Sequence, residues 1–247
     1  MLTSLLGGRV LAESFGRPPA TVLALHGWGR SRQDWNAVLN GFDGLALDLP
    51  GFGGASAPDT AWQVADYARY VAEVLATLDR PLLLGHSFGG RIAVKLAAAQ
   101  PELVGGLVLT GVPFFRTPST RRVPWQYRMA RRLHAVGLLG EEAMERRRRR
   151  YGSEDYRNAS GVMRQVLVKA VNEEYTADLE QLAGHDLDVS LVWGERDTAA
   201  PTWMAERAAG ILGARARLRV VPGAGHLLHE PLVGALREVL ADAGARA

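Results

Sequence analysis

Short apolar blocks alternate with longer amphipathic stretches along most of this chain. We predict strands at the blocks rich in Leu, Val and Ile, the first three of them buried and parallel: Thr21–Leu25, Gly44–Leu47, Pro81–Leu84, Gly106–Thr110, Val189–Trp193 and Leu218–Val221. Apolar residues recur near the helical period over Thr60–Leu78, Phe88–Gln100 and Leu232–Leu240, so helices are predicted there. This succession of strand and helix predicts an α/β architecture.

The pattern changes between Pro113 and about Asp186, where helical segments rich in Arg and Glu replace the strand blocks. No linker rich in Pro, Gly or Ser divides the chain, and no internal repeat of fixed period is present. We therefore predict one α/β core made of residues 1–112 and 187–247, with an inserted helical lobe at 113–186.

Composition narrows the class of protein. The chain has 247 residues, of which 47% are hydrophobic, and this is enough apolar surface for a packed core. It has no cysteine, which excludes disulfides, Cys-ligated metal centres and a thiol nucleophile. The longest stretch without a charged residue, Leu103–Phe115, is shorter than the roughly 20 residues that a membrane-spanning helix needs. Met1–Arg9 lacks the pattern of a signal peptide, so we expect a cytoplasmic location.

Charge is concentrated in the predicted insertion. The formal net charge is +3, yet residues 116–164 hold 13 arginines against five acidic residues, which leaves +8 there and −5 elsewhere. The five arginines of Arg146–Arg150 would point around a helix rather than along one face, and no nucleic-acid-binding motif accompanies them. The sequence therefore does not favour nucleic-acid binding, and a solvated helix surface explains the run.

A glycine-flanked serine follows the third predicted strand. Gly85-His86-Ser87-Phe88-Gly89 fits the pattern Gly-x-Ser-x-Gly between a strand and a helix. Such a turn needs glycines where a Cβ would collide with neighbouring backbone, and it exposes the serine hydroxyl at the start of a helix. The alternative is an ordinary glycine-rich turn with a capping serine. The motif predicts Ser87 as a nucleophile for acyl transfer.

A serine hydroxyl needs a base, and the base needs a carboxylate that orients it. His226 follows the strand Leu218–Val221 through a loop that contains glycine, and it is our predicted base. Asp197 follows the strand Val189–Trp193, and it completes the chain order Ser, Asp, His.

Other titratable residues are weaker candidates for these two roles. His229 is the rival base, while Glu195 and Asp48 are alternative acids; a turn-forming, hydrogen-bonding role is favoured for Asp48. His86 is the immediate neighbour of Ser87, and we expect its backbone to direct its side chain elsewhere; His26, His134 and His185 are interpreted as structural or surface groups.

An oxyanion formed at the serine would need two backbone donors. We predict the amides of Phe88, directly after the serine, and of Trp28, in the loop His26-Gly27-Trp28-Gly29. The side chains of Trp28 and Phe88 would either line an apolar wall for the substrate or pack in the core. Further candidate substrate-binding residues are the aromatic residues at the start of the predicted insertion, Phe114, Phe115, Trp125 and Tyr127.

Taken together, the sequence resembles the α/β hydrolase superfamily over about residues 20–231. Five motifs occur in the family's order: His26-Gly27-Trp28-Gly29, Asp48-Leu49-Pro50-Gly51-Phe52-Gly53, Gly85-His86-Ser87-Phe88-Gly89-Gly90, Trp193-Gly194-Glu195-Arg196-Asp197 and Gly225-His226. The resemblance implies a mostly parallel central sheet flanked by helices, with a lid-like helical cap. It also implies that Ser87, Asp197 and His226 are nucleophile, acid and base.

One departure concerns the base, because the Glu-Pro that follows His226 comes sooner than in many relatives and leaves His229 as an alternative. Serine at position 87 disfavours the dehalogenase and epoxide hydrolase branches, which attack through a carboxylate. Esterases, thioesterases, carbon–carbon bond hydrolases and small peptidases remain.

The expected function is hydrolysis of small carboxylic esters. The Trp-bearing loop and the Ser-Phe turn are similar to those of carboxylesterases that demethylate pimeloyl groups on acyl carrier protein. An acidic acyl carrier protein would be attracted to the arginine-rich insertion. A thioesterase or carbon–carbon bond hydrolase with the same trio, and a binding protein that keeps the fold without turnover, are the alternatives. No metal or cofactor is expected, because the chain has no His-Glu-x-x-His, Walker or Gly-x-Gly-x-x-Gly motif.

Overall fold

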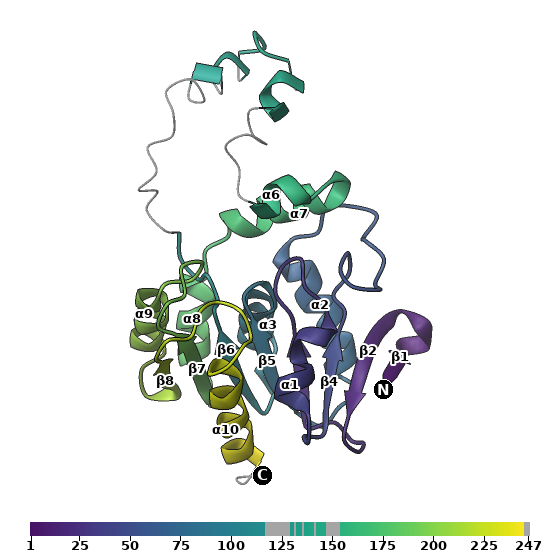
Figure 1. Ribbon diagram of the computed structural model, residues 1–247, viewed down its shortest axis with the longest axis vertical. Helices are drawn as coiled ribbons and strands as arrows, with labels where there is room; N and C mark the ends of the chain where they lie inside the picture. Colours follow the sequence, from purple (N-terminus) through teal and green to yellow (C-terminus); the bar gives the residue numbers. More distant parts are fainter. Residues whose placement is uncertain (117–128, 131, 135, 141, 147–153, 245–247) are drawn as a thin grey trace.

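The computed structural model describes residues 1–116, 129–130, 132–134, 136–140, 142–146 and 154–244. An eight-stranded sheet in the order β1-β2-β4-β3-β5-β6-β7-β8 runs through the molecule (Figure 1). Its strands are β1 (Leu2–Leu5), β2 (Val10–Phe15), β3 (Val22–Leu25), β4 (Gly44–Leu47), β5 (Leu82–His86), β6 (Gly106–Thr110), β7 (Val189–Gly194) and β8 (Ala216–Val221). The six predicted strands are confirmed, two of them, β4 and β6, with the predicted bounds.

The sheet is parallel from β4 through β8, and this confirms the predicted fold class. The sequence analysis missed β1 and β2, which pair antiparallel with each other and attach to β4 at one end of the sheet. Both strands are partly exposed, so they lack the continuous apolar character of the buried strands.

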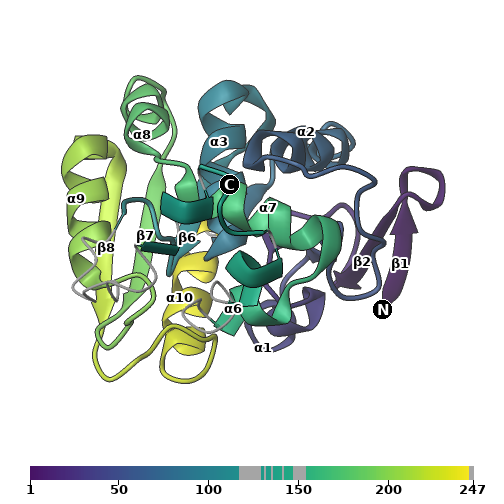
Figure 2. The same cartoon turned by 90° about the horizontal axis from the view of Figure 1, so that it is seen from above.

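Helices cover both faces of the sheet (Figure 2). On one face lie α2 (Val64–Leu75), α3 (Phe88–Ala99), α8 (Thr176–Ala183) and α9 (Thr202–Leu212); on the other lie α1 (Asn36–Leu39) and α10 (Leu232–Gly244). Because side chains alternate along a strand, each strand contributes to both cores. In β3, for example, Leu23 and Leu25 pack toward α2 and α3, while Val22 and Ala24 pack toward α1 and α10.

Helices are the regular elements in the described residues between β6 and β7. They include α6 (Glu154–Asn158), α7 (Gly161–Asn172) and α8, and Figure 1 shows α6 and α7 above the body of the sheet. Helix α8 falls inside the range 113–186 that we predicted as an insertion, yet it packs on α3 and α9 in the layer beside the sheet. The layer of helices beside the sheet therefore includes residues 176–183, which precede Asp186. Among the described residues, no helix combines the length and the apolar character that a bilayer crossing requires.

Candidate active site

Ser87 stands at a sharp turn between β5 and α3. Its backbone has φ 49° and ψ −110°, a conformation that residues other than glycine rarely adopt. The flanking glycines allow the turn: a Cβ at Gly85 would lie 2.6 Å from the Cα of Gly90, and one at Gly89 would overlap the carbonyl oxygen of Leu25. The local sequence therefore produces the strand-to-helix turn that the motif predicts, with the half-buried serine at its apex.

Asp197 and His226 meet at the carboxyl end of β7. The imidazole Nδ1 of His226 lies 2.7 Å from Oδ2 of Asp197, whose side chain is 1% exposed. The other carboxylate oxygen accepts hydrogen bonds from the amides of Ala199 at 2.9 Å and Ala200 at 2.7 Å. An ionised carboxylate only accepts, so Nδ1 carries the proton and Nε2 is left with a lone pair. This is the tautomer that a general base needs.

The His226 ring lies next to the turn that carries Ser87. A Cβ on Gly111 would lie 3.0 Å from ring atoms of His226, and the Ser87 amide donates to the carbonyl of the neighbouring Thr110 at 3.0 Å. Within the described residues, no hydrogen bond joins the Ser87 hydroxyl to this imidazole. Such bonds are often long without substrate, so the arrangement is compatible with proton transfer once a substrate binds.

His86 supports the loop that holds His226, a role that the sequence analysis did not foresee. Its Nε2–H donates to the backbone carbonyl of His226 at 2.9 Å, and the two rings lie 4.9 Å apart. Burial, with a smaller effect from His226, lowers the pKa of His86 to about 3, so the ring is neutral at physiological pH. The expectation that the backbone directs His86 away from the site is wrong, because its ring lies beside the ring of His226.

The alternative acids and base occupy other environments. The exposed Glu195 accepts from the amide of Gly223 at 2.9 Å, and His229 is exposed. Asp48 is buried and accepts from the amides of Arg32 at 2.8 Å and Gly54 at 2.7 Å. The predicted hydrogen-bonding role of Asp48 at a turn is therefore confirmed.

The remaining histidines bond to backbone atoms. His26 Nδ1 donates to the Gly27 carbonyl at 2.7 Å, and its Nε2 accepts from the Leu49 amide at 3.1 Å. Burial lowers the pKa of His26, which fits a neutral structural ring. His134 and His185 contact backbone carbonyls at 2.9 Å and 3.2 Å.

The loop that begins at His26 lies directly against the turn at Ser87. The Gly89 amide donates to the His26 carbonyl at 3.0 Å, and a Cβ on Gly27 would lie 3.3 Å from the Ser87 Cβ. In the part of the chain that the structure describes, the amides of Trp28 and Phe88 have no hydrogen-bond acceptor. Both are therefore left for an external acceptor beside the serine.

The predicted substrate-binding aromatic side chains divide into two groups. Phe88 is 4% exposed and contacts the rings of Trp28, Phe52 and Tyr67, so its side chain packs in the core. Trp28 lies at the surface of the same cluster and is only partly buried. Of the two interpretations, core packing fits Phe88, whereas Trp28 keeps exposed surface.

Phe114 and Phe115 also pack against core aromatic rings. Phe114 is fully buried and stacks on Trp193, and Phe115 stacks on Trp203 with 7% of its surface exposed. Their burial leaves little surface for a substrate, contrary to the expectation. Trp125 and Tyr127 lie outside the described residues.

A cavity of about 760 Å³ lies at the amino ends of the parallel strands, the end of the sheet opposite to Ser87. Its lining includes Thr21, Gly106 and Asp188, which stand at the amino ends of β3, β6 and β7. Ser87 lies at the carboxyl end of β5, so this cavity is not part of the candidate site.

Comparison with known proteins gives a family match. A family model described as "Alpha/beta hydrolase family" matches residues 22–239. Among curated proteins, the chain is 37% identical over 122 residues to Esterase Rv0045c of Mycobacterium tuberculosis, which covers 45% of this chain and 38% of that one. It is 28% identical over 239 residues to the "Biotin biosynthesis bifunctional protein BioHC" of Cellvibrio japonicus, with 85% and 44% covered. The chain thus spans less than half the length of these relatives.

A solved structure described as "Structure of a thermophilic esterase" has a similar fold. The TM-score is 0.70 at 23% identity, and 99% of this chain and 98% of that chain are covered. At this identity, the likeness concerns the fold alone.

Proposed function

The chain belongs to the alpha/beta hydrolase family, and we propose that it is a serine hydrolase that cleaves carboxylic esters through an acyl-enzyme on Ser87. The observation that carries the proposal is the hydrogen bond of 2.7 Å between Asp197 and His226, beside a serine held at a strained strand-to-helix turn. A buried carboxylate and an imidazole protonated at Nδ1 are the two groups that activate a serine hydroxyl.

In the proposed reaction, the Ser87 hydroxyl attacks the ester carbonyl while Nε2 of His226 removes its proton. The imidazolium that forms is stabilised by the Asp197 carboxylate, which keeps its hydrogen bonds to two backbone amides. His226 then protonates the leaving alcohol. Water, deprotonated by the same imidazole, attacks the acyl group and releases the acid and free Ser87.

The negative oxygen of each tetrahedral intermediate would accept hydrogen bonds from the amides of Trp28 and Phe88. Both amides have no acceptor among the described residues, and Phe88 begins α3, where the helix dipole favours negative charge. Each preorganised donor contributes a factor of roughly 10² to 10³ in rate. The partly exposed indole of Trp28 is the proposed apolar contact for the acyl group.

Esters are the proposed substrate class because the likeness to a curated esterase adds to the site geometry. A thioester or a carbon–carbon bond could be cleaved by the same trio, and a binding protein could keep the site without turnover. Turnover of p-nitrophenyl butyrate, acyl thioesters and a meta-cleavage dienoate separates these alternatives. A preference for either of the latter two over esters would reassign the substrate.

The experiment that tests the mechanism compares wild type with Ser87→Ala. Wild type should hydrolyse p-nitrophenyl butyrate and react stoichiometrically with a fluorophosphonate, and the variant should do neither while its melting temperature is kept. A Ser87→Ala protein that retains hydrolysis would refute the proposal. Wild type that reacts with neither reagent would favour the binding protein.

We also propose an acidic acyl carrier protein as the source of the ester. Arg132, Arg146 and Arg157 are exposed in the described part of the insertion, whose sequence carries an excess of positive charge. Such charges accelerate encounter with an acidic partner and make it salt-dependent. Turnover of a carrier-bound ester should therefore fall between 20 and 200 mM salt, while that of a free ester should not. Equal salt dependence of both substrates would remove the carrier proposal.

A further inference from the structure

Arg91 is a buried cation on the helix that begins directly after Ser87. It lies four residues after the serine, within α3, and 9% of its surface is exposed. Burial lowers the pKa of the guanidinium, but arginine stays charged in proteins, so burying it costs free energy that only good hydrogen bonds offset. In the sequence, an arginine inside such an apolar helix is the signal that indicates a buried, hydrogen-bonded cation.

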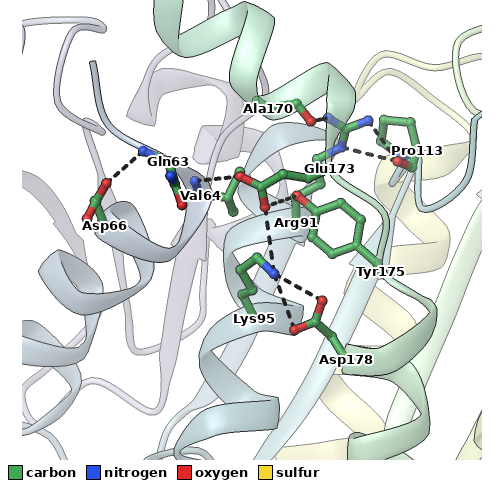
Figure 3. A network of polar contacts seen from close by, with 10 residues as sticks. All are labelled: Gln63, Val64, Asp66, Arg91, Lys95, Pro113, Ala170, Glu173, Tyr175 and Asp178. Atoms are coloured by element: carbon green, nitrogen blue, oxygen red, sulfur yellow. Dashed lines mark hydrogen bonds and ion pairs between the residues drawn. The ribbon is translucent and has the colours of Figure 1, made fainter.

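Among the described residues, the guanidinium of Arg91 donates its hydrogen bonds to backbone carbonyls at the start of the insertion and at the end of α7 (Figure 3). Nε and Nη2 donate to the Pro113 carbonyl at 3.1 and 2.8 Å, just after β6. Nη1 donates to the Ala170 carbonyl at 2.6 Å, in the last turn of α7. The same carbonyl accepts from the amide of Glu173 at 3.3 Å, and carbonyls in the last turn carry the negative end of the helix dipole, which favours a cation. One side chain thus holds the segment that enters the insertion and the segment that leaves it.

Lys95 and Glu173 extend this contact to a second helix of the core. Lys95, one turn after Arg91 on α3, lies 3.1 Å from Asp178 and 3.6 Å from Glu173. The other oxygen of Glu173 accepts from the amide of Val64 at 3.1 Å, at the start of α2. The segment after α7 is therefore held by both α2 and α3, as Figure 3 shows.

Met163 and Lys169 also contact the core from α7, but only Met163 is partly buried. The sulfur of Met163 occupies the space that a Cβ of Gly51 would need, in the loop after β4. Lys169 donates to the Ala61 carbonyl at 2.5 Å, but Lys169 is exposed. Helix α7 thus lies at the carboxyl ends of the parallel strands, the end of the sheet at which Ser87 follows β5, and Arg91 is its buried attachment.

We propose that Arg91 is a positioning residue that determines acyl specificity by fixing α7 above Ser87. The proposal rests on the proposed function for its link to substrate. Arg91 takes no part in the chemistry: its donors are bonded to carbonyls of the insertion. A long acyl group needs contacts with the wall that α7 provides, whereas an acetyl group needs few. Loosening the attachment should therefore raise KM for long esters and leave kcat unchanged.

The test compares Arg91→Met, which keeps an unbranched apolar stem without the donors, with Arg91→Lys, which keeps the charge but offers one donor nitrogen in place of the three that Arg91 uses. Lys169→Met is the matched control, because it removes an exposed cation that contacts the core from α7 itself. Hydrogen exchange of α7 amides in the intact protein is the first readout, with α10 as the internal reference. The second is kcat and KM for p-nitrophenyl acetate and octanoate.

In Arg91→Met, exchange over 161–172 should rise roughly tenfold or more while α10 is unchanged, and Lys169→Met should change it by less than about twofold. KM for octanoate should rise about fivefold, with kcat and the acetate constants within about twofold of wild type.

Unchanged exchange in α7, or an equal loss of kcat on both esters, would overturn the proposal. If Arg91→Met does not fold, Arg91→Lys decides: exchange over 161–172 equal to wild type overturns the proposal. Inactive wild type would refute the proposed function, while the exchange experiment would still test the attachment.

Discussion

Asp197→Asn tests whether the carboxylate acts through the tautomer of His226. The two amides that bond to Oδ1, from Ala199 and Ala200, require an acceptor, so the new amide oxygen takes that place. The new NH₂ group then faces Nδ1 of His226, 2.7 Å away in the wild type. Two donors cannot share this hydrogen bond, so the imidazole must move its proton to Nε2. A protonated Nε2 cannot accept the proton of Ser87.

The expected falls in kcat and in the free energy of unfolding follow from the tautomer that is lost and from the hydrogen bonds that are kept. Loss of the correct tautomer is expected to lower kcat about 10⁴-fold, or about 5.5 kcal/mol in the activation free energy. The two hydrogen bonds to backbone amides remain, and the charge-assisted bond to His226 is replaced by one between neutral groups, so the free energy of unfolding should fall by only about 1 kcal/mol and the melting temperature by about 2–4 °C.

The assay is kcat and KM for p-nitrophenyl butyrate at pH 7, with a thermal melt of each protein. Glu195→Gln is the matched control: it makes the same change at an exposed carboxylate beside β7 and should leave kcat within about twofold. A variant Asp197→Asn that keeps more than about a tenth of wild-type kcat would refute the reasoning, as would an equal loss in the control.

Three further predictions concern the turn at Ser87 and the histidines around it. Gly89→Ala should lower the free energy of unfolding by about 3 kcal/mol or more, because its Cβ would overlap a strand carbonyl. Gly210→Ala, with nothing within 4 Å in α9, should raise it by about 0.5–1 kcal/mol, and urea titration of the two variants checks both signs. The neutral form of buried His86 stabilises the fold fully above the unfolded-state pKa of 6.5, and this contribution is lost as the pH falls toward the folded-state pKa of about 3. The free energy of unfolding should therefore decrease by on the order of 1 kcal/mol per pH unit in this window through His86, and an equal pH slope in His86→Asn would contradict this. Finally, His226→Ala should lower kcat about 10⁴-fold or more and His229→Ala by less than about twofold, and the reverse order would assign the base to His229.

Local sequence patterns were sufficient for much of the fold. The buried strands β4 and β6 begin and end where predicted, and α3 begins at Phe88 as its motif requires. Continuous apolar runs and glycine motifs encode these elements because both act within a few residues. The partly exposed β1 and β2 lack such runs and were missed.

The sequence by itself determined the order of the six predicted strands and the turn that presents Ser87, and it predicted Asp197 and His226 as the companions of the serine. Only the tertiary structure decided that His86 donates to the His226 backbone, that Phe114 is buried against Trp193, and that α8 belongs to the core. It also showed that Arg91 holds two carbonyls that are 22 and 79 residues away. The physical reason is the separation along the sequence of the residues that interact. Periodicity and turn conformation depend on residues that are near in sequence, whereas these contacts join distant segments that only packing of the whole chain brings together.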